Sequence, residues 1–173
     1  MDNEKIQNLI NECKQIEEDS LYTAEVHYII GHKQKVKAFW FKFIPVLITL
    51  GTSFALLVGA APNWVAWITF FSALITVINI LLEPEKESKN HFIAAQNFTT
   101  LKHEARSLYE AFKDFMDEKD FYHEVRKLRD KYNLYARLTP PTDDEDAWEK
   151  ARERIKKGYH IADFRQKEKE NKL

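Results

Sequence analysis

The sequence predicts an all-α protein with a two-helix transmembrane hairpin, and with long N-terminal and C-terminal cytoplasmic helices that form a helical bundle. Three observations predict this class. The chain has 173 residues with 26 basic and 27 acidic side chains, yet none of these charges lies between 43 and 82. Outside that range apolar residues recur at spacings of three and four, which is the helical period. Only four glycines and five prolines interrupt the chain.

The range 1–42 is expected to be a cytoplasmic helix that runs towards the membrane. Its apolar face follows the helical spacing through Ile6, Leu9, Cys13, Ile16 and Ser20. Cys13 has no second cysteine to pair with and lies on that face, so we expect a buried structural thiol.

The uncharged range 43–82 divides into two arms, 43–61 and 64–82, at Pro62-Asn63, a pair typical of turns. Each arm forms a helix of about 28 Å, close to the thickness of the hydrocarbon core of a bilayer. The short connection makes the arms antiparallel neighbours, which predicts a transmembrane hairpin. A cleaved signal peptide is the rival interpretation of the first arm, but the residues that precede it are too many for an n-region.

The flanks of the arms predict the orientation of the hairpin. Lysines lie before the first arm and none lies in the turn, so both termini are expected in the cytoplasm, in a multi-pass arrangement. The tryptophans are expected to lie at the membrane interfaces. These topology anchors are Lys33, Lys35, Lys37, Lys42, Trp40, Trp64 and Trp67. Pro45, in the first turn of the first arm, predicts a kink.

Two patterns distinguish the arms. In the first arm small residues recur every four positions and predict a face on which another helix backbone packs closely: Gly51, Ala55 and Gly59. In the second arm four polar side chains share one face: Thr69, Ser72, Thr76 and Asn79. This stripe either lines a water-filled path between assembled hairpins or bonds to its own helix and the neighbouring one. The arms contain no ionisable group, which argues against an ion-coupled transporter.

The cytoplasmic range 83–173 carries two seams of heptad spacing. The first comprises Ala94, Phe98, Leu101, Ala105, Leu108, Phe112 and Phe115, and the second comprises Phe121, Val125, Leu128, Tyr132 and Tyr135. Residues 116–120 separate them, as a tight turn or as a stutter, and we favour the turn.

The range after the second seam is expected to be a short helix followed by a tail. Pro140-Pro141 ends the preceding helix. Acidic residues 143–146 then begin a helix whose apolar face is Trp148, Ala151 and Ile155 and which stops at Gly158. A mobile tail is expected from about 165.

The residues that carry chemistry form no catalytic constellation. The six histidines lack the spacing with which one helix holds zinc, and no glycine-rich phosphate loop is present. The chain is nearly neutral, which argues against a nucleic-acid polymer as partner. We therefore expect no enzyme, no cofactor and no metal site.

The layout resembles the SLATT family, a two-transmembrane effector domain of bacterial nucleotide-signal systems. The resemblance covers residues 20–157. It lies in the basic-flanked hairpin, in the helix from His91 to Arg106, in the segment Tyr22–Tyr28, and in Pro140-Pro141 leading to Trp148–Arg152. The family implies a homo-oligomeric antiphage effector of the bacterial inner membrane, which breaches the lipid bilayer on a cyclic-nucleotide signal. No separate nucleotide-binding domain accompanies the hairpin here, so the signal would reach the helices directly or through a cytosolic sensor protein.

Three functions remain open from the sequence. The first is a pore-forming effector whose cytoplasmic helices associate through their heptad seams. The second is a non-conducting membrane-anchored scaffold or accessory subunit that docks a cytosolic partner. The third is a membrane enzyme that uses His103 or His123.

Overall fold

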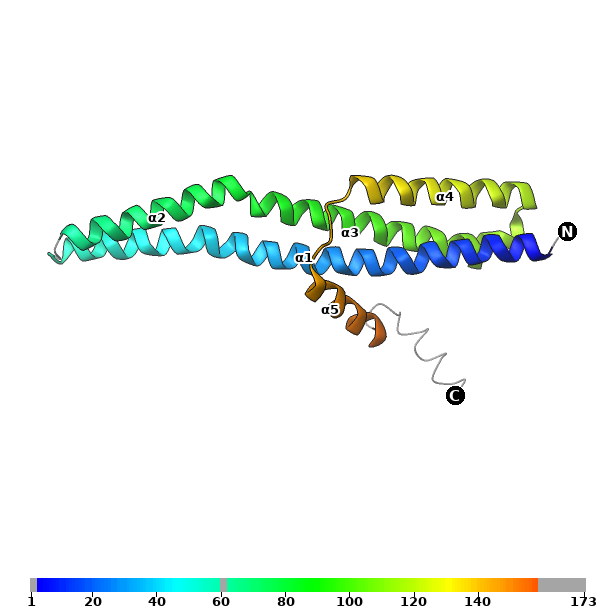
Figure 1. Ribbon diagram of the computed structural model, residues 1–173, viewed down its shortest axis with the longest axis horizontal. Coiled ribbons are helices and arrows are strands. Elements are labelled where there is room, and N and C mark those ends of the chain that lie inside the picture. Colours follow the sequence, from blue (N-terminus) through cyan, green and yellow to red (C-terminus); the bar gives the residue numbers. More distant parts are fainter. Residues whose placement is uncertain (1–2, 60–61, 159–173) are drawn as a thin grey trace. The chain divides into compact units, whose positions relative to one another are not determined.

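The computed structural model describes residues 3–59 and 62–158, and every element within them is helical. Five α-helices follow in order: α1 (Asn3–Leu57), α2 (Pro62–Leu82), α3 (Pro84–Ser107), α4 (Glu118–Leu138) and α5 (Glu145–Lys156) (Figure 1). The all-α class is therefore confirmed. Two helical stretches, one within 4–57 and one within 63–115, are long and apolar enough to cross a membrane.

The first apolar arm is shorter than predicted. Helix α1 continues through Pro45 and ends at Leu57, so the predicted limit of 61 is wrong. Gly59 has φ 82°, a left-handed conformation in which helices commonly stop, and its N–H donates to the Leu56 carbonyl at 3.2 Å. Helix α2 begins at Pro62, two residues before the predicted start, because a proline fits the first helical position.

The chain divides into two compact units by packing. One combines 3–30 with 91–158, and is called here the helical unit. The other is 31–90, the hairpin unit, which includes the lysines before the first arm. The predicted limits at 42/43 and 82/83 follow the charges of the sequence. The hairpin unit extends beyond both limits, to 31 and to 90.

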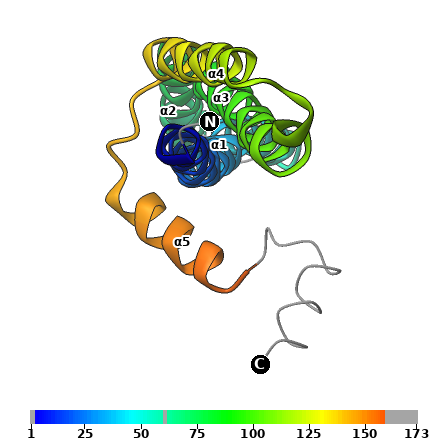
Figure 2. The same cartoon turned by 90° about the vertical axis from the view of Figure 1, so that its right-hand side faces the viewer.

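The helical unit has one main core, to which α1, α3 and α4 contribute (Figure 2). The first seam is buried from Ala94 to Leu108, and Phe98 at its centre is 1% exposed. The second seam is buried from Phe121 to Leu128. Cys13 is fully buried in the same core, as predicted. These seams are covered by other helices of the same chain, so they are not faces available for association between copies.

The connection between α3 and α4 is the predicted tight turn, and the stutter is wrong. A π-helical turn (Leu108–Phe112) and a 3₁₀ turn (Lys113–Phe115) follow α3, and the Asp117 side chain caps α4 by accepting from the Asp120 N–H at 2.7 Å. The predicted seam is also wrong at its end, because Phe112 is 51% exposed and Phe115 89%. A π-helical turn holds one extra residue, which rotates the following side chains out of the core.

The short helix α5 forms as expected. Asp144 caps it by accepting from the Ala147 N–H at 3.1 Å, and Gly158, at φ 74°, lies just beyond its end. Ala147 and Ala151 are buried in a second small core with Val26 and Ile30 of α1. The tail predicted from about 165 lies outside the described residues.

Candidate functional site

The outer surface of the hairpin is apolar, and its interior is partly polar. Within the described residues of 43–82, the buried side chains are Thr52, Val65 and Ser72. Phe54 is 67% exposed and Leu57 84%, and most large apolar side chains of both arms are exposed in the same way. A water-soluble unit buries such side chains, because each costs about 1.5–3 kcal/mol when left in water. This inverted pattern is that of a surface in contact with lipid.

The two arms meet along a seam that sequence reasoning missed. On α1 the least exposed positions are spaced by three and four: Pro45, Ile48, Thr52 and Ala55. On α2 they are Val65, Ser72, Ile75 and Asn79. The Ser72 hydroxyl donates across the seam to the Pro45 carbonyl at 3.4 Å. In the first arm no hydropathy period marks the contact face, so the sequence holds little signal for it. In the second arm Ser72 and Asn79 of the polar stripe lie on the seam, so the stripe marks this face in part.

Most side chains of the polar stripe form their hydrogen bonds within the hairpin. The Thr69 hydroxyl donates to the Val65 carbonyl at 2.9 Å, and the Thr76 hydroxyl donates to the Ser72 carbonyl at 3.1 Å. With the Ser72 bond across the seam, three of the four side chains form the bonds of the packing interpretation. Asn79 differs, because its Oδ1 is buried and has no hydrogen-bond partner.

The small-residue face is divided by the structure. Ala55 lies on the seam between the arms, whereas Gly59 lies beyond the end of α1 and does not extend a helical face. Gly51 is exposed, and a Cβ added there would have no other atom within 4 Å. The surface around Gly51 is therefore open in the single chain.

The predicted anchors lie on the surface of the hairpin unit. Lys33, Lys35, Lys37 and Lys42 are exposed, as are Trp40, Trp64 and Trp67. The Lys42 ammonium forms an ion pair with the Glu85 carboxylate, which joins the segment before the first arm to the segment after the second. The hydrogen bond from Lys42 lowers the pKa of Glu85, and the charge of Lys42 adds to this effect.

The helical unit contains a buried histidine pair. The Nδ1 atoms of His27 and His91 lie 2.8 Å apart, and the two residues are 1% and 6% exposed. Burial, and then the neighbouring His91, lower the pKa of His27 to about 4. His27 is thus neutral at pH 7, and in this contact the ring nitrogen of one histidine donates to that of the other. The residues are 64 apart in sequence, and the predictions based on helical spacing within one helix did not find them.

A second polar cluster joins α1 to α3. Glu17 accepts from the Arg106 guanidinium and from the Tyr109 hydroxyl, the latter at 2.7 Å. Lys102 is only 8% exposed, and its pKa is lowered, mainly by burial. The charges of Glu17 and Glu25 oppose this lowering. Glu25 also accepts from Arg154 at 2.8 Å, which ties α5 to α1.

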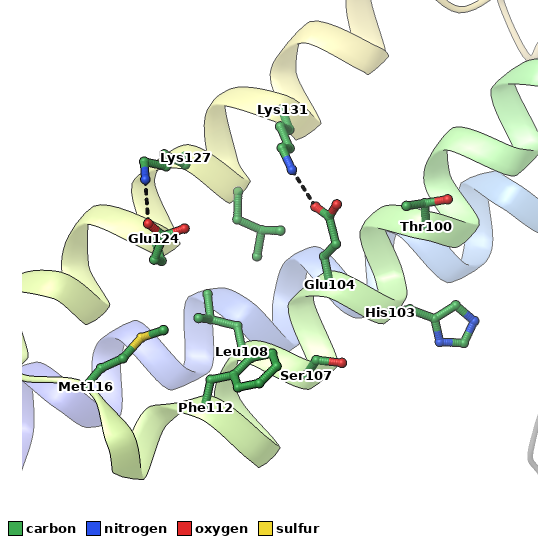
Figure 3. A pocket seen from close by; sticks show the side chains of 11 residues that line it. Thr100, His103, Glu104, Ser107, Leu108, Phe112, Met116, Glu124, Lys127 and Lys131 are labelled. Atoms are coloured by element: carbon green, nitrogen blue, oxygen red, sulfur yellow. Dashed lines mark hydrogen bonds and ion pairs between the residues drawn. The ribbon is translucent and has the colours of Figure 1, made fainter.

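An open groove of about 460 Å³ lies between α3 and α4 (Figure 3). Its apolar residues are Leu108, Phe112, Met116 and Leu128. At its edge Lys131 donates to Glu104 at 2.8 Å, and Lys127 bonds with Glu124. The groove lies beside the π-helical turn that rotates Phe112 out of the core. Its lining also holds His103, whose pKa is lowered by burial and by Lys102 and Arg106.

Within the described residues, no three His, Cys, Asp or Glu side chains gather as metal ligands do.

The comparisons with known proteins found no match. No family model, curated protein or solved structure matches this chain. The SLATT resemblance therefore remains a prediction, and the candidate site is defined by geometry alone: an apolar hairpin, and a helical unit with a groove.

Proposed function

We propose that this protein is an oligomeric effector of the bacterial inner membrane, of the antiphage type that the SLATT resemblance implies. The single observation that carries the proposal is the inverted burial of the hairpin, in which Phe54 and Leu57 are exposed and Thr52 and Ser72 are buried. Such a surface needs lipid around it. Both termini then lie in the cytoplasm, on the side of the lysines.

In this proposal several hairpins associate and open a path through the membrane when a signal reaches the helical unit. The signal is a nucleotide or a cytosolic sensor protein. The exposed surface around Gly51 is the contact between hairpins, since the heptad seams are already covered within one chain. The chain acts without catalysis and without a cofactor.

The test is induced expression in bacteria with a potential-sensitive dye. Membrane insertion is measured in the same cells by resistance of the chain to alkaline extraction. We expect depolarisation when induced cells receive the signal on phage infection. Complete insertion together with an unchanged potential, both with and without phage infection, contradicts the proposal.

A matched pair of variants tests the polar stripe. Thr76 and Thr49 each donate their hydroxyl to the carbonyl four residues back in their own helix. Thr76→Val and Thr49→Val therefore remove the same bond at nearly constant volume. If the stripe lines the path, only Thr76→Val changes the rate of depolarisation. Equal effects of the two variants indicate that the stripe only packs.

The second candidate function is a non-conducting scaffold, and the groove between α3 and α4 favours it. The half-exposed Phe112 ring and the apolar lining are typical of a docking site for another protein. Replacing 43–82 with an unrelated two-helix anchor separates the candidates, because only a scaffold keeps its activity after the exchange.

A further inference from the structure

A cleft of about 500 Å³ lies within the hairpin unit where α2 passes into α3. Its lining residues are Lys42, Asn79, Ile80, Glu83, Pro84, Glu85, Lys86 and Lys89. The cleft contains the last turn of the second arm, which under the proposed function lies at the cytoplasmic interface of the bilayer. The headgroups of lipids occupy this depth, and the inference below rests on that proposed membrane location.

The charges of the cleft are of both signs and are near the surface. Lys42 pairs with Glu85, and Lys86 pairs with Glu83 at 2.7 Å. More than half of each of these four side chains is exposed, so the pairs contribute little stability and exchange partners readily. Lys89 adds a third ammonium group. Such a site suits a ligand that carries a negative and a positive group close together.

Asn79 adds a specific requirement for a hydrogen-bond donor. Its Oδ1 is buried and unpaired, and an unsatisfied buried acceptor costs about 1–3 kcal/mol. The final torsion of an asparagine side chain is soft, so the carboxamide can turn its oxygen towards the cleft that it lines. A ligand with an N–H group satisfies this oxygen, and a ligand without a donor does not.

The backbone at the cleft is also unusual. Glu83 has φ 41°, the left-handed region that non-glycine residues rarely adopt, and the chain passes there from α2 to α3. Backbone strain of this kind occurs often at ligand sites. The Glu83 carbonyl accepts from the N–H groups of Lys86 and Glu87. The first hydrogen bonds of α3 therefore start at the strained residue.

We propose that this cleft binds the headgroup of a phosphatidylethanolamine-type lipid. The phosphate contacts the ammonium groups of Lys42, Lys86 and Lys89. The ethanolamine ammonium donates to the Asn79 oxygen and to the carboxylates of Glu83 and Glu85. The headgroup thereby replaces two exposed ion pairs with a zwitterion of matching charge, and it pairs the one stripe residue that the hairpin leaves unsatisfied.

Phosphatidylcholine is the matched control lipid. It has the same phosphate and the same net charge as phosphatidylethanolamine, but its quaternary ammonium has no N–H to donate. The full chain is purified in detergent, exposed to equal amounts of the two lipids with identical acyl chains, and analysed by native mass spectrometry. We expect retention of phosphatidylethanolamine over phosphatidylcholine by about tenfold, the ratio that corresponds to one net hydrogen bond to a charged group.

Two variants assign the preference to the cleft. Asn79→Leu is expected to remove the preference for phosphatidylethanolamine, whereas Thr76→Val, one turn earlier, preserves it. The double variant Lys42→Gln with Lys89→Gln is expected to weaken retention of both lipids several-fold, and Lys150→Gln on α5 changes neither. Soluble glycerophosphoethanolamine at millimolar concentration is expected not to displace the lipid, because the acyl chains hold it in the bilayer. Displacement by the soluble compound assigns the site to a free phosphoethanolamine ligand and overturns the lipid proposal.

Equal retention of the two lipids by the unaltered chain overturns the proposal, as does a preference that survives in Asn79→Leu. Resistance to alkaline extraction is measured on each preparation. A chain that is not inserted contradicts the proposed function and the lipid site together. A chain that is inserted but shows no lipid preference contradicts only the lipid site.

Discussion

Helix α1 passes through both units of the protein, and its apolar residues have opposite environments in the two. In the helical unit Cys13, Ile16 and Val26 are completely buried. Further along the same helix, Leu50 is 63% exposed and Leu57 84%. Helical geometry is the same in both halves, so it does not decide which residues are buried. The difference is the cover that other helices provide. Helices α3, α4 and α5 contribute with the first half to two cores, whereas α2 packs along one side of the second half and leaves its other sides exposed.

The two units therefore obey different stability rules. In the helical unit, removing apolar volume from the core lowers the free energy of unfolding. In the hairpin unit, large apolar side chains lie on the outer surface, so removing one of them is expected to change the packing of the chain on itself very little. Substitutions and pH changes in each unit test this contrast.

Phe98→Ala is expected to lower the free energy of unfolding of the helical unit by about 3–5 kcal/mol, because a buried phenylalanine leaves a cavity. Phe98 is 1% exposed, and Tyr132 and Tyr135 contact it edge-on with ring centroids 6.0 and 6.3 Å away. Denaturant unfolding of the full chain in detergent, followed by hydrogen exchange of α3, gives the measurement. Phe54→Ala in the hairpin is the control and is expected to leave this unfolding unchanged.

Acidification is expected to destabilise the helical unit through His27. The pKa of His27 is about 4 in the folded chain, against about 6.5 when unfolded. Between these values the unfolded chain binds a proton that the folded chain does not, so the free energy of unfolding falls as pH drops from about 6.5 to about 4. The loss amounts to roughly 3 kcal/mol and is complete near pH 4.

Unfolding curves of the full chain at several pH values measure this dependence. His27→Phe is expected to flatten it. His123→Gln is the control, because His123 is exposed on α4. A slope that is unchanged in His27→Phe assigns the acid sensitivity to other groups.

Glu17→Gln is expected to lower the free energy of unfolding of the helical unit by about 2 kcal/mol. The change removes the charge that Arg106 and Lys102 face in a half-buried position, where solvent screens it only partly. Glu153→Gln is the matched control, because its partner Lys157 lies 3.8 Å away and both side chains are 63% exposed. Equal losses in the two variants contradict the role assigned to burial.

Gly51→Leu is expected to cause the smallest change within one chain and a large change between chains. The position is open, because a Cβ added there meets no other part of the chain within 4 Å, so we expect the variant to insert normally. If hairpins associate there, the leucine keeps their backbones apart, and crosslinking of oligomers in membranes decreases. Gly51→Ala is the control and is expected to preserve crosslinking. Unchanged crosslinking in Gly51→Leu places the contact between copies elsewhere.

The sequence was sufficient for those parts of the fold that depend on residue type and local spacing. The separation of charged from uncharged residues predicts the two apolar helices, and the spacing from Ala94 to Leu108 predicts a buried seam. Proline and glycine signals predict where α4 and α5 end. The topology and the function remain predictions, because they depend on partners and lipid that a single chain does not contain. The family remains a prediction because no known protein matches the chain.

The parts that sequence reasoning missed depend on distant pairs. His27 meets His91 only because α1 and α3 lie side by side, and no pattern within either helix records that contact. The seam of the hairpin is hidden in the first arm, because no period of apolar residues there marks one face. The π-helical turn overrides the heptad spacing at Phe112, and the residues Leu108–Phe112 have no proline or glycine that predicts it.

The π-helical turn has a consequence for how this protein varies between relatives. It accommodates one residue more than an α-helical turn does, so deletion of a single codon within 109–111 would leave an ordinary α-helical turn there. The residues that follow the deletion would keep their present orientation, so Phe112 and Phe115 would stay outside the core and the groove would keep its exposed ring. A relative that is one residue shorter in this segment is thus expected to lose the π-helical turn and to retain the groove.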